Sequence, residues 1–162
     1  MPINWGDVPG FLEPRLTLFF SVDLVGSTSL KQKGEYPLKS HEEATFKDLG
    51  ASWFAPIAKF YGDVDRQFAI SWRNCEIAYK NALHGKELDI KPELWKTNGD
   101  ELVYTVVLNK AEHVAYVLAA WTKALRNYRN DLIKQNHDLD VKGTAWLAGF
   151  PTGLFSSDHV AL

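Results

Sequence analysis

Residues 16–25 read LTLFFSVDLV, a short and nearly continuous apolar run that contains one acid, Asp23. Such a run is typical of a strand buried within a sheet. An ionised carboxylate inside a buried strand is costly unless a cation or several hydrogen-bond donors compensate it. We therefore expect Asp23 to be buried and to have a charged or hydrogen-bonding partner.

More strands and a long helix are predicted downstream. Residues 94–97 and 101–108 are rich in β-forming residues, and Asn98-Gly99 between them predicts a tight hairpin, because both residues tolerate positive φ. Residues 111–136 carry apolar side chains at helical spacing, and residues 141–150 again have the pattern of a central strand. Four basic residues are expected on the solvent-exposed side of this helix rather than in a phosphate site: Lys123, Arg126, Arg129 and Lys134.

The segment between the first strand and the hairpin is less regular. Ser40 and Glu43 form an S-x-x-E capping box, which predicts a helix that continues to about Phe60. Pro56 would kink this helix or separate it from a second one. Beyond it, residues 68–72 suggest a short strand and residues 75–83 a helical stretch.

The order of these elements predicts an α+β fold, with helices stacked on one face of a mainly antiparallel sheet. The length of 162 residues, with 46% apolar and 23% charged residues, is typical of one compact domain. A net charge of −2 provides no general attraction to nucleic acid or to an anionic membrane. A single cysteine, no signal peptide and no apolar run of roughly 20 residues together predict a cytoplasmic protein without a membrane segment.

Asp100, directly after the hairpin turn, is the natural second acid. A strand end and a neighbouring turn can meet at one end of a sheet, and Mg²⁺ favours one or two carboxylates together with substrate phosphates. Taken singly, Asp23 is equally well explained as a buried acid bonded to a turn, and Asp100 as a turn former. Lys96 adds a cation on the same hairpin, and the combination favours a nucleotide site.

The turn after the first strand supports this interpretation. It contains Gly26, Ser27 and Thr28. Glycine allows a close approach to phosphates, and successive backbone N–H groups at the entry to a helix attract anions. We expect these three residues to bind phosphate.

Two motifs carry a family resemblance. FFSVDLVGST (19–28) resembles the first metal-binding strand and phosphate loop of class III nucleotide cyclases, and WKTNGDELVYTV (95–106) resembles their hairpin. VKGTAWLAGF (141–150) takes the place of the next central strand. The combination is most similar to bacterial pyrimidine cyclases of the Pycsar anti-phage system, which make cyclic UMP or cyclic CMP. The resemblance spans about residues 16–151 and implies a ferredoxin-like βαββαβ core.

The resemblance also implies roles for individual residues. Asp23 and Asp100 match the two metal-binding aspartates, and the Leu24 carbonyl matches the backbone ligand, so that two divalent cations, Mg²⁺ or Mn²⁺, are implied as cofactors. Lys142 matches a basic residue that contacts the nucleotide phosphates, and Lys96 matches the base-selecting lysine of adenylyl cyclases. The family pattern further implies a homodimer whose active sites lie across the subunit interface.

The sequence departs from the family pattern in two places. The gap of 77 positions between the aspartates is unusually wide and predicts an insertion between Trp72 and Pro92. The family's terminal helix, which supplies an asparagine and an arginine to the transition state, has no counterpart before Leu162. We expect residues 1–162 to form a single catalytic domain that lacks its C-terminal part.

The implied reaction converts UTP to 3′,5′-cyclic UMP and pyrophosphate by two-metal catalysis. UTP is favoured over CTP because a lysine can donate to O4 of uracil, whereas cytosine presents an amino donor there. The alternatives are a cytidylate or adenylate cyclase, a diguanylate-cyclase-like enzyme suggested by NGDEL (98–102), and a catalytically silent dimerisation module. The histidines lack metal-ligand spacing and are expected at the surface or in caps: His41, His84, His113, His137 and His159.

Overall fold

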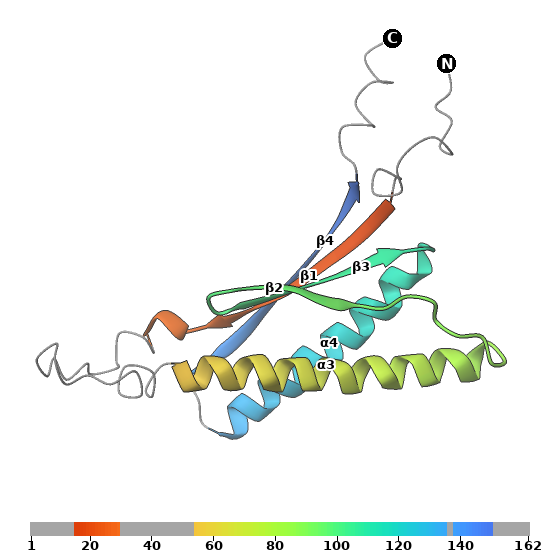
Figure 1. The fold of residues 1–162 in the computed structure, drawn as a ribbon. Coiled ribbons are helices and arrows are strands. Elements are labelled where there is room, and N and C mark those ends of the chain that lie inside the picture. Colours follow the sequence, from red (N-terminus) through yellow and green to blue (C-terminus); the bar gives the residue numbers. More distant parts are fainter. Residues whose placement is uncertain (1–14, 30–53, 136–137, 151–162) are drawn as a thin grey trace, which may run out of the picture.

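The computed structural model describes residues 15–29, 54–135 and 138–150. Along these residues the order of elements is strand, helix, two strands, helix and strand (Figure 1). The elements are β1 (Arg15–Val25), α3 (Phe54–Ala82), β2 (Glu93–Asn98), β3 (Glu101–Leu108), α4 (Glu112–Lys134) and β4 (Asp140–Phe150). The four strands and the helix predicted at 111–136 are confirmed to within two residues. The predicted capping box at Ser40 and Glu43 lies outside the described residues.

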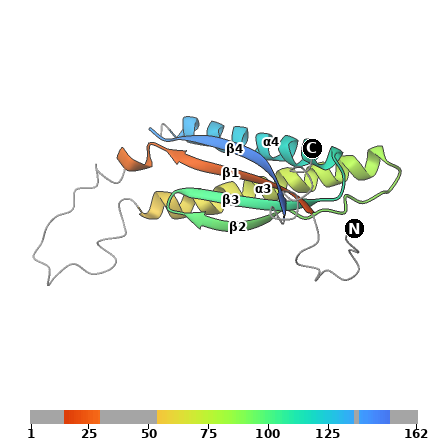
Figure 2. The same cartoon turned by 90° about the horizontal axis from the view of Figure 1, so that it is seen from above.

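The strands form one sheet in the order β2-β3-β1-β4, and each neighbouring pair is antiparallel (Figure 2). The register of β1 against β3 runs from Leu16↔Leu108 to Asp23↔Glu101. Both helices cover the same face of the sheet (Figures 1 and 2). This is the predicted α+β architecture, and its strand order is compatible with a ferredoxin-like core.

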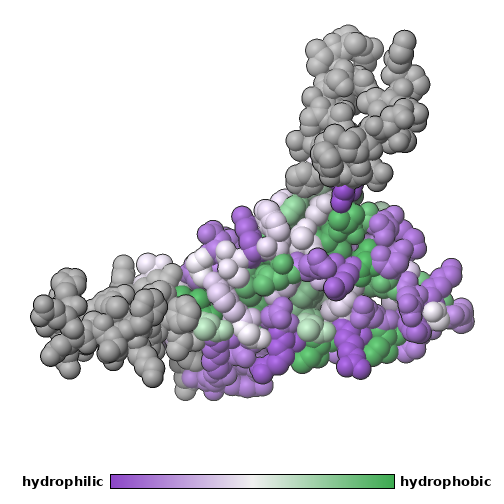
Figure 3. Space-filling model, viewed as in Figure 1, coloured by the Kyte–Doolittle hydropathy of each residue, from purple (hydrophilic) through white to green (hydrophobic). Residues whose placement is uncertain are grey.

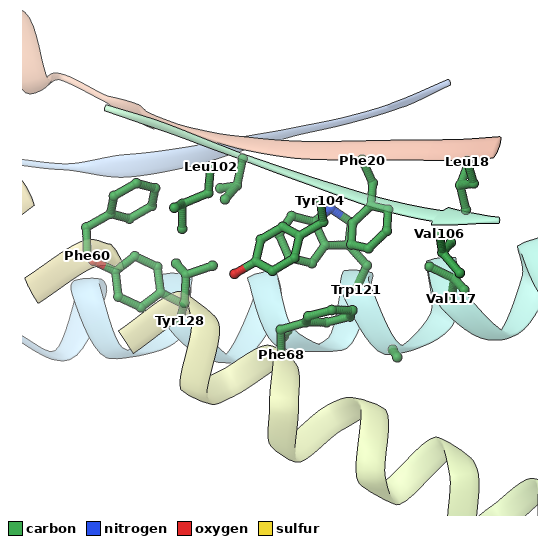
Figure 4. Close-up of a cluster of buried hydrophobic side chains, with 14 of the residues drawn as sticks. Leu18, Phe20, Phe60, Phe68, Leu102, Tyr104, Val106, Val117, Trp121 and Tyr128 are labelled. Atoms are coloured by element: carbon green, nitrogen blue, oxygen red, sulfur yellow. The ribbon is translucent and has the colours of Figure 1, made fainter. Parts of the chain in front are cut away.

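The core is an aromatic cluster between the central strand and the two helices (Figure 4). The ring of Phe20, on β1, is centred 5.0 Å from that of Trp121, 5.4 Å from Phe68 and 5.5 Å from Tyr104. Alternate residues of β1 are almost fully buried on this side: Leu18, Phe20, Val22 and Leu24. The face of β1 that carries Asp23 is therefore the one turned away from the helices, and we call it the open face.

α3 is one helix of 29 residues, so the strand predicted at 68–72 is wrong. Phe68 and Ser71 are buried while Ile70 is 50% exposed, which is helical rather than alternating spacing. The buried stripe continues at intervals of three or more residues: Ile57, Phe60, Val64, Phe68, Ser71 and Tyr79. The helical stretch predicted at 75–83 is the end of α3. Pro56 lies in its first turn, where the missing N–H has no helical partner and no kink is required.

α4 has the predicted orientation, because Lys123, Arg126, Arg129 and Lys134 are all exposed. His113, however, is fully buried and its ring nitrogens make no capping hydrogen bond among the described residues, so the prediction of a surface or capping position is wrong for it. It occupies the inner stripe of α4 together with Val117 and Trp121, so that helical spacing determines its burial. Its Nε2 lies 3.6 Å from Oδ1 of Asp89.

The outer side of α3 is mostly hydrophilic in the view of Figure 3, with a few hydrophobic side chains between the polar ones. Two of the exposed apolar residues on this helix are Ile70 and Ile77. In the described part of the chain, neither long helix has the uninterrupted apolar length that crossing a bilayer requires.

Candidate active site

Asp23 lies near the end of β1 on the open face of the sheet, and it is exposed. The prediction that it is buried is therefore wrong. The run LTLFFSVDLV is nearly continuous because residues on the open face of β1, such as Phe19, are also buried, whereas Asp23 lies nearer to the strand end. An exposed Asp23 does not need a compensating partner in the way that a fully buried carboxylate would, so its role must be judged from its neighbours.

Asp100 lies in the turn between β2 and β3, at the same end of the sheet as Asp23. The backbone N–H of Leu24 donates to the carbonyl oxygen of Asp100 at 3.1 Å, which joins the two acidic segments directly. Glu101, the next residue, is the register partner of Asp23. Leu24 itself is buried, with an exposed fraction of 1%. The two aspartates predicted to share a site are therefore brought to the same sheet edge.

Two side chains hold the position of Asp100. The hydroxyl of Ser27 donates a hydrogen bond to its carboxylate, and the hydroxyl of Tyr61 on α3 donates to the carbonyl of Gly99 in the same turn. Ser27 is buried, so its side chain serves Asp100 and only its backbone is available for the predicted phosphate role. Thr28 beside it is exposed.

Gly26 has a φ of +91°, a conformation that side chains with a Cβ rarely adopt. A Cβ at this position would also lie 3.0 Å from the carbonyl oxygen of Asp138. The turn after β1 thus packs closely against the segment that precedes β4. Both observations make glycine necessary here for a structural reason, besides the predicted approach of phosphate.

A row of charged and polar side chains crosses the open face at this edge. The register pairs Asp23 with Glu101 on β3 and with Lys142 on β4, and Glu101 with Asn98 on β2. Directly paired residues of adjacent strands have their side chains on the same face. Lys142, the predicted phosphate ligand, is therefore the cross-strand neighbour of Asp23.

The acidic neighbours alter the ionisation of Asp23. Its pKa is raised, first because its carboxylate is partly desolvated and then because Asp100 and Glu101 repel its negative charge. The cation of Lys142 and a hydrogen bond from the backbone of Leu24 lower the pKa in part. Excess negative charge of this kind is what a bound cation would neutralise.

Asp23 and Asp100 fit a hard divalent cation only if the cation takes its other ligands from water and a bound phosphate. The described residues contain no group of three or more acidic, histidine or cysteine side chains arranged to hold a metal. Asp23 and Asp100 supply two carboxylates at one edge, and Mg²⁺ commonly takes one or two carboxylates with the remaining ligands from water and phosphate. The donor set therefore fits a metal that is shared with a phosphorylated ligand.

Lys96 lies apart from the two aspartates. It pairs with Val103 on β3, so it is two strands away from β1, or about 10 Å between strand axes. Its ammonium lies 4.5 Å from the ring centroid of Trp95, which is 55% exposed and contacts Phe19 edge to face. Lys96 is thus on the same sheet as the acids, two strands away from the strand that carries Asp23.

Two residues near the site were missed by the sequence analysis. Glu101 could have been found, because it follows Asp100 and the two-residue period of β3 places it opposite Asp23. Tyr61 carries no such signal, since its contact with the turn at Gly99 joins residues 38 positions apart. Its pKa is raised by burial and then by the charge of Asp100, so the hydroxyl remains a donor at neutral pH.

Replacing Asp23 with asparagine is expected to stabilise the fold at neutral pH by about 0.5 kcal/mol, the usual size of a like-charge pair across strands. A raised carboxyl pKa means that the folded state binds the proton more tightly, so ionisation above the ordinary pKa of 3.8 favours unfolding. Thermal unfolding of both proteins between pH 3 and 8 measures this. The gain in Tm should vanish near pH 3, and a lower Tm for the variant at pH 7 would contradict the assignment.

Comparisons with known proteins give no family assignment: no family model matches the chain, and no curated protein matches it. The resemblance to class III cyclases therefore depends on the motifs around Asp23, Asp100 and Lys142 and on their placement in the fold.

Proposed function

We propose that this chain is a class III nucleotide cyclase that converts UTP to 3′,5′-cyclic UMP and pyrophosphate. The observation that carries the proposal is the meeting of Asp23 and Asp100 at one sheet edge, where the Leu24 amide bonds the Asp100 carbonyl. The motifs FFSVDLVGST and WKTNGDELVYTV supply these two residues in the order of the family. The sheet edge where Asp23 and Asp100 meet carries an excess of negative charge, and Lys142 is a nearby cation. This combination suits a complex of a metal ion with a nucleotide.

In the proposed reaction the ribose 3′-hydroxyl attacks the α-phosphorus, the bond to the β-phosphate oxygen breaks, and the hydroxyl proton passes to solvent. Asp23, Asp100 and the Leu24 carbonyl would hold two Mg²⁺ or Mn²⁺ ions. When bound, such ions lower the pKa of the hydroxyl and neutralise charge on the departing pyrophosphate. Lys142 pairs with phosphate oxygens, and the backbone of the turn at Gly26 approaches them.

The base is assigned to Lys96, whose ammonium donates to O4 of uracil. Because Lys96 lies two strands away from Asp23, it would serve a nucleotide held by the acids of a second subunit, as the family pattern implies. The open face offers apolar area for such a homodimer: Trp95 is 55% exposed, and Trp146 and Val107 are each 42% exposed. Exposed apolar patches of this kind mark interaction sites. The resemblance to Pycsar enzymes further suggests a cytoplasmic signal in anti-phage defence.

The decisive experiment incubates the protein with each of the four nucleoside triphosphates and Mn²⁺ and identifies the products by mass spectrometry, beside the Asp23→Ala variant. Cyclic UMP from wild type, and its loss in the variant, is the expected result. No metal-dependent product from any of the four nucleoside triphosphates would favour the catalytically silent module.

A second candidate activity is that of a diguanylate-cyclase-like enzyme. The observation that favours it is Glu101, which follows Asp100 in the hairpin and lies across from Asp23. The product distinguishes the two activities, since a cyclic dinucleotide made from GTP would replace the uridylate assignment. Cyclic CMP or cyclic AMP as the main product would retain the cyclase and change only the base assignment.

The base assignment is tested by replacing Lys96 with glutamate, which accepts hydrogen bonds where lysine donates them. Because cytosine presents an amino donor at the same edge, the UTP to CTP ratio of kcat/KM is expected to fall at least about tenfold, the equivalent of one good hydrogen bond. Lys110→Glu is the matched control, because Lys110 is an exposed lysine beyond the opposite end of β3. An unchanged ratio in Lys96→Glu would remove Lys96 from base selection.

A further inference from the structure

β4 is the outermost strand of the sheet, and its outer side is not paired with any strand in the described part of the chain (Figure 2). It is 11 residues long and pairs with β1 without a register shift. The residues from Lys142 to Leu147 are all exposed. One of them is Gly143, whose exposed area belongs to the backbone, so the peptide groups along this edge are accessible. Unpaired peptide groups of an edge strand are a template for a further strand.

The opposite edge strand, β2, has features that oppose such pairing. It has only 6 residues, it carries charges at Glu93 and Lys96, and its register against β3 shifts between Leu94 and Lys96. Short length, charged side chains and irregular register are the usual protections of an edge strand. Residues 143–147 of β4 read GTAWL, without a charge. β4 rather than β2 is therefore the edge that is open to another strand.

The exposed side chains of β4 are complementary in size to those of a second copy of the same strand. An antiparallel pairing about a two-fold axis at Ala145 places Leu147 opposite Gly143 of the second copy. The same register places Trp146 opposite Thr144 of the second copy. Leu147 is 51% exposed and Trp146 is 42% exposed in the single chain, so each large exposed side chain would meet a small residue.

The charges on β4 are compatible with this register. The two strands would overlap over residues 142–148, a length of about 24 Å at the usual rise of a strand. Lys142 is the single charged residue in this interval. In the register centred on Ala145 it lies opposite Ala148 of the second copy, so no like charges meet directly across the joint.

The helix side of the strand provides apolar contact for the pairing. Gly143 and Ala145 line an apolar hollow between α4 and β4, together with Leu118 and Leu125 of the helix. Leu147 lies on the same side of β4, because residues two positions apart in a strand share a face. Leu147 of the second copy would therefore lie beside Gly143, at the margin of this hollow. Removal of its apolar area from water would add to the backbone hydrogen bonds of the joint.

We propose that β4 is a self-association edge, at which two copies of this chain pair antiparallel about a two-fold axis at Ala145 and join their four-stranded sheets into one. The contact is isologous, since the same strand serves both copies. The axis is perpendicular to the sheet, so the two open faces lie on the same side and stay accessible. The inference does not depend on the cyclase proposal, whose homodimer is assigned to the open face rather than to this edge.

A cysteine placed at the axis tests the register. Ala145→Cys is made in a Cys75→Ser background, in which serine can still donate to the Tyr116 carbonyl, so that each chain carries one thiol. In the proposed joint the two Cβ atoms at position 145 lie about 5 Å apart, close to the span of a disulfide. Mild oxidation should convert most of the protein to a covalent dimer. Thr97→Cys in the same background, at an exposed position on β2, is the matched control. It should cross-link at least about tenfold more slowly, because its thiols meet only by collision.

A lysine on the edge provides a second test that needs no cross-link. Leu147→Lys should raise the dimer dissociation constant, measured by analytical ultracentrifugation, at least about tenfold, because an edge lysine opposes strand pairing. Leu94→Lys is the matched control and should leave the constant unchanged, since Leu94 is a leucine of similar exposure, 46%, on the other edge strand.

Two results would overturn the proposal. The first is a wild-type chain that sediments as a monomer at every soluble concentration, including one whose β4 amides are protected from hydrogen exchange by another part of the same chain. The second is a dimer that Leu147→Lys does not weaken and that position 145 does not cross-link, which would assign the dimer to another surface. Neither result would bear on the cyclase proposal, which is tested by its products.

Discussion

Replacement of Asp100 with asparagine is expected to lower metal-dependent cyclase activity about a thousandfold, or about 4 kcal/mol of transition-state stabilisation. Asparagine has the same size and still accepts a hydrogen bond from the Ser27 hydroxyl, and the bond from the Leu24 amide goes to the backbone. The expected loss is therefore one of negative charge at the edge that we propose binds the metal. Rates of cyclic UMP formation at several Mn²⁺ concentrations, with calorimetric titration of Mn²⁺, measure it.

The control for this variant is Glu87→Gln, which removes a carboxylate that is 80% exposed and pairs with Lys80 away from the site. It should leave the rate unchanged. Because removal of the Asp100 charge relieves its repulsion of Asp23, the Tm of Asp100→Asn should not fall. An Asp100→Asn protein that keeps its metal-dependent rate would exclude Asp100 from the catalytic site, whatever the fate of the cyclase assignment.

Replacement of Phe20 with alanine is expected to destabilise the fold by about 3–5 kcal/mol, a large part of the stability of an ordinary domain. Phe20 is fully buried and its ring contacts those of Phe68, Tyr104 and Trp121, so the substitution leaves a cavity that both helices border. Tm should fall by about 10 °C or more for a domain of this size. Chemical denaturation with a linear extrapolation measures the free energy of unfolding.

The matched control is Ile70→Ala on α3, which removes an apolar side chain that is 50% exposed. Its effect should stay within about 0.5 kcal/mol, because alanine is a good helix former and little apolar area is lost. Equal losses in the two variants would mean that the aromatic cluster is not the centre of the stability of this domain.

The strands and α4 could be predicted because each has a local signal that its tertiary contacts reinforce. Asn98-Gly99 requires a turn that admits positive φ, and Gly99 indeed has a φ of +64°. The segment 68–72 misled because five consecutive residues of low polarity (FAISW) fit a strand in isolation. The helical period is visible only over the longer interval from Ile57 to Tyr79. Within a short segment the apolar but exposed Ile70 hides the three- to four-residue spacing of the buried positions.

The sequence allowed us to predict that the two acids of the candidate site lie together, but not the exposure of Asp23 or the side chains that contact the Asp100 turn. Sequence order and the hairpin turn placed Asp23 and Asp100 at a common edge, whereas the exposure of Asp23 depends on which face of β1 the helices cover. The contacts of Ser27 and Tyr61 with the Asp100 turn join distant segments and have no local pattern. They arise from the way the layers pack, which composition and periodicity do not specify.

The hydroxyl of Tyr61 links the helical layer to the turn that carries the second acid. The helical layer behind the sheet thus helps to fix where the tip of the β2–β3 hairpin lies relative to the end of β1. In the proposed cyclase, a substitution on α3 that removed this hydroxyl would alter the position of Asp100 without changing either aspartate.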